Sequence, residues 1–83
     1  MKVLYFAWLR QRTGTGEEEI TLPEGVGDVA GLVEHLKTLS EGHAFAFEDL
    51  SAIKVAVDQE YATLEAPLDG AREVAFFPPV TGG

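Results

Sequence analysis

A single amphipathic helix constrains the fold of this chain more than any other feature. Between Asp28 and about Glu41, apolar residues recur at helical spacing on one stripe: Val29, Leu32, Val33, Leu36 and Leu39. Asp28 is placed to cap the first turn, and Gly42 is placed to end the helix. Because one apolar stripe has to be buried, the segments on either side of the helix must supply a sheet for it to pack on.

Strand-like segments do flank the helix. Five have the composition or the alternation of strands: residues 2–10, 17–22, 53–57, 61–64 and 72–77. Residues 43–50 are ambiguous between a short helix and an irregular cover for the core. We therefore predict an α+β domain of the β-grasp, ubiquitin-like class, with a mixed sheet of about five strands packed on one main helix.

The first strand-like segment is apolar on both sides. Alternation places Val3, Tyr5, Ala7 and Leu9 on one side and Leu4, Phe6 and Trp8 on the other. A domain of 83 residues cannot bury both rows. One row is predicted to be exposed, and a contiguous exposed apolar surface is typical of a binding face.

Charge and cysteine content narrow the classes of partner. Fourteen acidic residues against six basic ones give a net charge of −8, which disfavours nucleic acid and anionic membranes as partners. The acidic surface fits a basic protein partner, although it also serves solubility. The absence of cysteine excludes disulfides and thiol nucleophiles and fits a reducing compartment. No stretch approaches the roughly 20 apolar residues of a membrane span, so we expect a cytoplasmic protein.

Residues able to carry catalysis are sparse. His35 and His43 lack further ligands at metal-binding spacing, so we predict no metal site and expect solvent-facing or capping histidines. The carboxylates of residues 17–19 and 48–49 are interpreted as surface charge, because nothing near them predicts the raised pKa of a general acid. No phosphate-binding or nucleophile motif occurs. The chain is therefore not predicted to be an enzyme on its own.

The last ten residues, 74–83, contain no charged side chain. Pro78 and Pro79 favour an extended polyproline path, and at about 3.1 Å per residue the six residues 78–83 would project roughly 19 Å. Gly82 and Gly83 make the slimmest possible peptide, and the α-carboxylate stands at its tip. We divide the chain into a domain, residues 1–77, and a C-terminal tail, residues 78–83. The alternative is an idle, frayed terminus.

The terminal carboxylate is the one candidate reactive group that is unusually placed, at the tip of a slim tail. It is unreactive until another protein activates it. Coupling to AMP would create a leaving group, after which a sulfur or amine nucleophile could attack the Gly83 carbonyl. Since the chain has no nucleotide-binding motif, ATP and the catalytic residues must come from partners. The pattern therefore indicates a carrier.

The tail and the first strand resemble one known family. Residues 69–83, ending Phe-Phe-Pro-Pro-Val-Thr-Gly-Gly, and residues 2–7, Lys-Val-Leu-Tyr-Phe-Ala, resemble the small subunits of molybdopterin synthase, which are ubiquitin-like sulfur carriers. The resemblance implies that a ubiquitin-activating-like adenylyltransferase uses ATP and magnesium to adenylate Gly83. A sulfur donor protein would then convert it to a thiocarboxylate, with no cofactor bound stably by the carrier.

The same resemblance implies a partner and a passage. The tail residues Pro78, Pro79, Val80, Thr81 and Gly82 would carry Gly83 into the large synthase subunit. There the thiocarboxylate would give its sulfur to cyclic pyranopterin monophosphate in molybdenum cofactor biosynthesis, within a heterotetramer. The family's contacts to the large subunit map onto Phe6, Tyr61 and Phe77. The alternative for Phe6 and Phe77 is that they are core residues, as isolated aromatics more often are.

Three other functions stay open from the residues alone. A sulfur carrier for thiamine or tRNA thiolation uses the same Gly-Gly chemistry, and a ubiquitin-like modifier would join Gly83 to lysines of target proteins. A plain interaction domain with an idle tail is the third. The Phe-Phe-Pro-Pro-Val-Thr segment favours the molybdopterin type.

Overall fold

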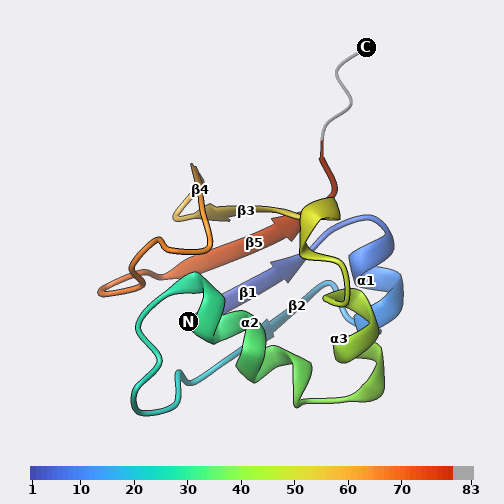
Figure 1. Ribbon diagram of the computed structural model, residues 1–83, viewed down its shortest axis with the longest axis horizontal. Helices are drawn as coiled ribbons and strands as arrows, with labels where there is room; N and C mark the ends of the chain where they lie inside the picture. Colours follow the sequence, from blue (N-terminus) through green and yellow to red (C-terminus); the bar gives the residue numbers. More distant parts are fainter. Residues whose placement is uncertain (80–83) are drawn as a thin grey trace.

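The computed structural model describes residues 1–79, which form one five-stranded mixed sheet with helices on one face. Figure 1 shows β1 and β5 at the centre of the sheet and β2 and β4 at its edges. The strands are β1 (Lys2–Tyr5), β2 (Glu17–Glu19), β3 (Lys54–Val57), β4 (Glu60–Ala62) and β5 (Glu73–Phe77). β1 and β5 are parallel and the other pairs are antiparallel. This order confirms the predicted β-grasp fold.

The main helix is α2 (Val29–Lys37), and four residues of the predicted stripe, Val29, Leu32, Val33 and Leu36, are buried. The prediction was wrong for Leu39, which lies beyond the end of the helix and is exposed. The Asp28 carboxylate accepts a hydrogen bond from the Gly31 backbone N–H at 2.8 Å, which confirms the predicted cap. The helix ends at Lys37, earlier than the predicted end at about Ser40 or Glu41.

The first strand ends at Tyr5, so the prediction of a strand over residues 2–10 was wrong in its second half. Ala7, with φ of 54°, turns the chain into α1 (Trp8–Thr13), and Gly14, with φ of 84°, ends that helix. Residues 8–13 are rich in good helix formers such as leucine, arginine and glutamine, which the apolar alternation concealed. Leu9 still enters the core, but from a helix.

The ambiguous segment folds as α3 (Glu41–Ala46) followed by a short 3₁₀ helix, η1 (Leu50–Ala52). Gly42 therefore lies inside α3, and its predicted role as the stop of the main helix was wrong. A Cβ on Gly42 would overlap the carbonyl oxygen of Arg12 in α1. Glycine is needed here because it lets the two helices approach closely.

The core lies between the helices and the inner face of the sheet. Its largest fully buried side chains come from β1, β5 and the helix layer: Tyr5, Phe47, Phe76, Leu9, Leu32 and Leu36. The rings of Phe47 and Phe76 meet edge to face, with centroids 4.9 Å apart. The odd positions of β1 and the even positions of β5 therefore anchor the helices to the sheet.

The second predicted strand is shorter than expected, because β2 stops at Glu19. Ile20 is buried and Leu22 is half-buried, but both lie beyond the strand. β2 is an edge strand, and the exposed Glu17 and Glu19 protect that edge from pairing with another chain.

Candidate functional site

The outer face of the sheet carries an apolar row that crosses four strands. Leu4 in β1 pairs in register with Ala75 in β5, which in turn pairs with Ala56 in β3. Ala56 lies opposite Tyr61 in β4, so these side chains share one face. The row runs from the centre of the sheet to its β4 edge.

A second apolar row lies beside the first, at the end of β5. Phe6 follows β1 and its backbone N–H donates to the Phe76 carbonyl at 3.1 Å, which continues the strand pairing. Phe77 is the last residue of β5, and its ring centroid lies 5.9 Å from that of Tyr61. We call Leu4, Phe6, Ala56, Tyr61, Ala75 and Phe77 the outer face.

The outer face is open to solvent, whereas the helices cover the opposite side. Phe6 is 49% exposed and Tyr61 is 82% exposed, and Phe77 is half-buried. Ala75, a small residue in the central strand, is the buried member of the outer face. Phe6 is therefore not a core residue, and the structure brings Phe6, Tyr61 and Phe77 together on one surface. Trp8 does not join them, because it belongs to α1.

The tail leaves the domain at this same surface. β5 ends at Phe77, and Pro78 and the exposed Pro79 follow it directly. The remaining predicted tail residues, Val80, Thr81, Gly82 and Gly83, lie outside the described residues. Whatever accepts the chain beyond Pro79 thus meets the outer face beside it.

A buried polar network on the inner side links β1, β2 and α3. The Tyr5 hydroxyl donates to Oε2 of Glu18 at 2.6 Å, and Nε2 of His43 donates to the same oxygen at 2.7 Å. Nδ1 of His43 lies 2.7 Å from the Ser40 hydroxyl, which also accepts the His43 backbone N–H. The ring of His43 is buried, so the expectation of a solvent-facing or capping histidine was wrong for this residue.

The network changes the acidity of its two acidic members. Burial alone would raise the pKa of Glu18, but hydrogen bonds from Tyr5 and His43, together with attraction to His43, lower it below its ordinary value. Burial raises the pKa of the Tyr5 hydroxyl, and its hydrogen bond to the Glu18 carboxylate and the charge of that carboxylate raise it further.

Glu18 was expected to be surface charge like its neighbours, and this was wrong. Strand alternation turns it to the face opposite that of Glu17 and Glu19. A carboxylate on the inner face needs hydrogen-bond donors around it. The position of Glu18 between two outward-facing glutamates was therefore the sequence signal that could have predicted the network.

Comparison with known proteins identifies the family. The profile of the ThiS family matches residues 3–83, which is nearly the whole chain. The chain belongs to the ThiS family.

Known proteins and solved structures are similar to this ThiS-family chain over nearly its full length. The molybdopterin synthase sulfur carrier subunits of Escherichia coli and Haemophilus influenzae are 40% and 35% identical to it over 83 residues, which cover all of this chain and 99% of each relative. A Pyrococcus furiosus structure named for molybdopterin converting factor, subunit 1, superposes with a TM-score of 0.72 at 34% identity, covering 95% of both chains. SAMP1 from Haloferax volcanii gives a TM-score of 0.72 at 26% identity, covering 100% of this chain and 98% of the other.

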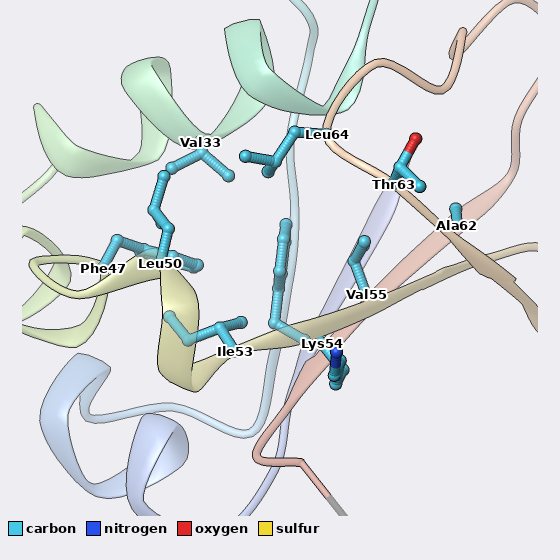
Figure 2. Close-up of a pocket in the computed structure, with 10 residues that line it drawn as sticks. Val33, Phe47, Leu50, Ile53, Lys54, Val55, Ala62, Thr63 and Leu64 are labelled. Atoms are coloured by element: carbon cyan, nitrogen blue, oxygen red, sulfur yellow. The ribbon is translucent and has the colours of Figure 1, made fainter.

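This ThiS-family domain also contains an inner cavity of about 190 Å³ between α2, η1 and the segment after β4. Figure 2 shows Val33 and Leu64 pointing toward it from one side and Leu50 and Ile53 from another. Its lining is mostly apolar. It offers space for apolar groups but no arrangement for catalysis.

Within residues 1–79, no three histidine, cysteine, aspartate or glutamate side chains are grouped to hold a metal ion. None of the helices formed by these residues has the length and apolar character needed to cross a bilayer.

Proposed function

We propose that this chain is the sulfur carrier subunit of a molybdopterin synthase. The observation that carries the proposal is the juxtaposition of an exposed apolar face with the exit of a Pro-Pro-Val-Thr-Gly-Gly tail at Phe77. The names of two full-length relatives, at 40% and 35% identity, support it. The carrier is the non-catalytic, sulfur-donating subunit of this sulfurtransferase complex.

The chemistry takes place at the Gly83 carboxylate. A carboxylate oxygen attacks the α-phosphorus of ATP on a ubiquitin-activating-like adenylyltransferase, where magnesium accompanies the nucleotide, and pyrophosphate leaves. Sulfur from a donor protein then attacks the acyl carbon and AMP leaves, which gives a C-terminal thiocarboxylate after the donor bond is broken by reduction or by a second thiol. Gly82 has no side chain to obstruct either active site.

The large synthase subunit receives the loaded tail. Phe6, Tyr61 and Phe77 dock on it, and residues 78–82 pass through a narrow channel to its active site. There the thiocarboxylate gives its sulfur to cyclic pyranopterin monophosphate, and the complex is a heterotetramer. We place this reaction in the cytoplasm, and the lack of cysteine in the sequence fits that reducing compartment.

The mass of the intact C-terminus tests the chemistry. After incubation with the adenylyltransferase, ATP and a sulfide source, we expect the mass gain of one oxygen replaced by sulfur. Covalent adducts with other proteins would instead indicate a ubiquitin-like modifier. If a chain lacking Gly82 and Gly83 still supports molybdopterin formation with the large subunit, the proposal is wrong.

Docking is tested separately at the outer face. Phe77→Asp places a charge in an apolar interface and is expected to cost about 3 kcal/mol or more of association free energy, because the carboxylate loses water without gaining a partner. Leu39→Asp is the matched control, since Leu39 is also exposed, at 41%, but lies just after α2. Calorimetric titration with the large subunit should separate the two variants. Equal affinities would remove Phe77 from the docking face.

A further inference from the structure

Two grooves flank the aromatic ridge formed by Phe6 and Phe77, and each contains one cation. On the β4 side, Lys54 lines a groove of about 330 Å³ with Tyr61 and Phe77. On the β2 side, Arg10 lines a groove of about 390 Å³ whose other members include Phe6. The apolar centre of the outer face is thus bounded by positive charge on both sides.

Lys54 is held on the outer face by strand register. It pairs directly with Phe77, and cross-strand neighbours share a face. Its side chain is exposed, and it makes no ion pair with any residue among 1–79. Lys2 and Lys37, in contrast, each have a glutamate oxygen nearby, at 3.6 and 3.4 Å.

Arg10 reaches the other groove from α1 and lies against Gly16. A Cβ added to Gly16 would come within 3.2 Å of the Arg10 Nε and 3.3 Å of its Cζ, so glycine leaves the space that the guanidinium occupies. Arg10 is also without an ion pair inside the described region. Glu17 lines the same groove, but its carboxylate pairs with Lys2.

The opposite end of the sheet, far from the tail, has the reverse charge. By strand register, Lys2 in β1 lies between Glu73 of β5 and Glu19 of β2 on the outer face at this end, so two carboxylates flank one ammonium group. The outer face therefore changes from an excess of positive charge at the tail exit, with Lys54 and Arg10, to an excess of negative charge at its far end, in a chain whose net charge is −8.

We propose that the two grooves bind carboxylates, so that the partner surface that accepts this face is an apolar recess flanked by two aspartate or glutamate side chains. One carboxylate would lie opposite Lys54 and the other opposite Arg10, whose planar guanidinium can bind it through two parallel hydrogen bonds. This inference rests on the proposed function, because it describes the partner that takes up the tail.

Charge complementarity also fixes the orientation of docking. The net charge of −8 alone would favour a partner with a uniformly basic surface. Such a surface would be repelled by Lys54 and Arg10 at the tail exit. A partner that is acidic around the tail channel and basic beyond it matches both ends of the face. Such a pattern steers the tail toward its channel before the apolar contacts form.

The test measures how fast the full-length chain associates with the large synthase subunit, by stopped flow at low and at raised salt. Lys54→Glu combined with Arg10→Glu is expected to lower the association rate constant about tenfold or more and to reverse its salt dependence, because charges at the rim of an interface act mainly on that rate. Each single reversal should give a part of this effect. Thermal melting of the free variants verifies that they are folded.

Lys37→Glu is the matched control, since each single reversal and this one alter the charge equally but Lys37 lies on α2, away from the outer face. If Lys54→Glu and Arg10→Glu associate as fast as Lys37→Glu, the inference is wrong. If, in that same series, Phe77→Asp prevents binding, only the carboxylate inference fails, and the docking face and the proposed function are still supported. If Phe77→Asp also binds normally, the docking proposal itself fails. Replacing a partner carboxylate by lysine should restore the rate of the reversed variants.

Discussion

The two faces of the central sheet are both apolar, yet only one of them is buried. On the inner face, Tyr5 and Phe76 are 1% exposed and Val55 is 6% exposed. On the outer face, Phe6 and Tyr61 are 49% and 82% exposed. Strands β1, β3 and β5 supply residues to both faces, so the difference comes from the helices, which pack on the inner side.

The comparison separates two uses of apolar surface. The inner face stabilises the folded domain, because its side chains leave water when the chain folds. The outer face can contribute in the same way only when another protein covers it, since its side chains stay in water in the free domain. Substitutions on the inner face should therefore change folding, and those on the outer face should change association.

The largest effect is expected from paired substitutions of the adjacent residues Phe76 and Phe77. Phe76→Ala removes a fully buried ring and should lower the free energy of unfolding by about 3–5 kcal/mol. Phe77→Ala removes a half-buried ring from the other face and should cost about 1 kcal/mol. Urea unfolding followed by circular dichroism measures both. Equal losses would mean that the faces do not divide folding from docking.

The next effect concerns the helix layer that closes the inner face. Gly42→Ala would push a methyl group into the Arg12 carbonyl and should cost about 1–3 kcal/mol of stability. Gly27→Ala is the control, because a Cβ there meets nothing within 4 Å, and its effect should stay within about 0.5 kcal/mol. A Gly42→Ala variant as stable as the parent would show that α1 and α3 can move apart freely.

A smaller effect is expected from the buried polar network. Glu18→Gln weakens the charge-assisted hydrogen bonds from Tyr5 and His43 and should cost about 1–2 kcal/mol at neutral pH. The folded state lowers the pKa of Glu18, so the unfolded chain binds its proton more readily. The stabilisation is therefore complete above the ordinary glutamate pKa of 4.5 and is lost as the pH falls below that value.

Unfolding measured between pH 3 and pH 7, a range of about four units around that pKa, tests the sign. The parent should lose more stability than Glu18→Gln as the pH decreases, so the two curves converge. Glu19→Gln is the control, because Glu19 is exposed and its one ion pair among residues 1–79 is with the N-terminal amine. Parallel curves for the parent and Glu18→Gln would contradict the assigned network.

The smallest effect on folding is expected at Tyr61. Tyr61→Ala should change the free energy of unfolding by about 0.5 kcal/mol or less, because the side chain is 82% exposed in the free domain. The same variant should weaken binding to the large subunit, since tyrosine side chains that become buried at an interface contribute strongly to its affinity. A large loss of stability would place Tyr61 among the folding residues.

The sequence by itself determined the parts of this protein that depend on near neighbours. The apolar stripe of α2, the Asp28 cap and the alternation of Val74 to Phe77 follow from local geometry, and the structure confirms them. The resemblance of residues 2–7 and 69–83 to a sulfur-carrier family agrees with the ThiS profile over residues 3–83. Local periodicity and a terminal motif need no knowledge of which segments meet.

Only the tertiary structure decided the features that depend on distant segments. The strand expected over residues 2–10 ends at Tyr5, because Ala7 turns the chain and α1 packs against α3 around Gly42. Glu18 meets His43 across 25 positions of sequence. Alternation along a strand assigns its residues to two faces. Which face remains exposed to solvent depends on the side on which the helices pack, and that is determined by the whole chain.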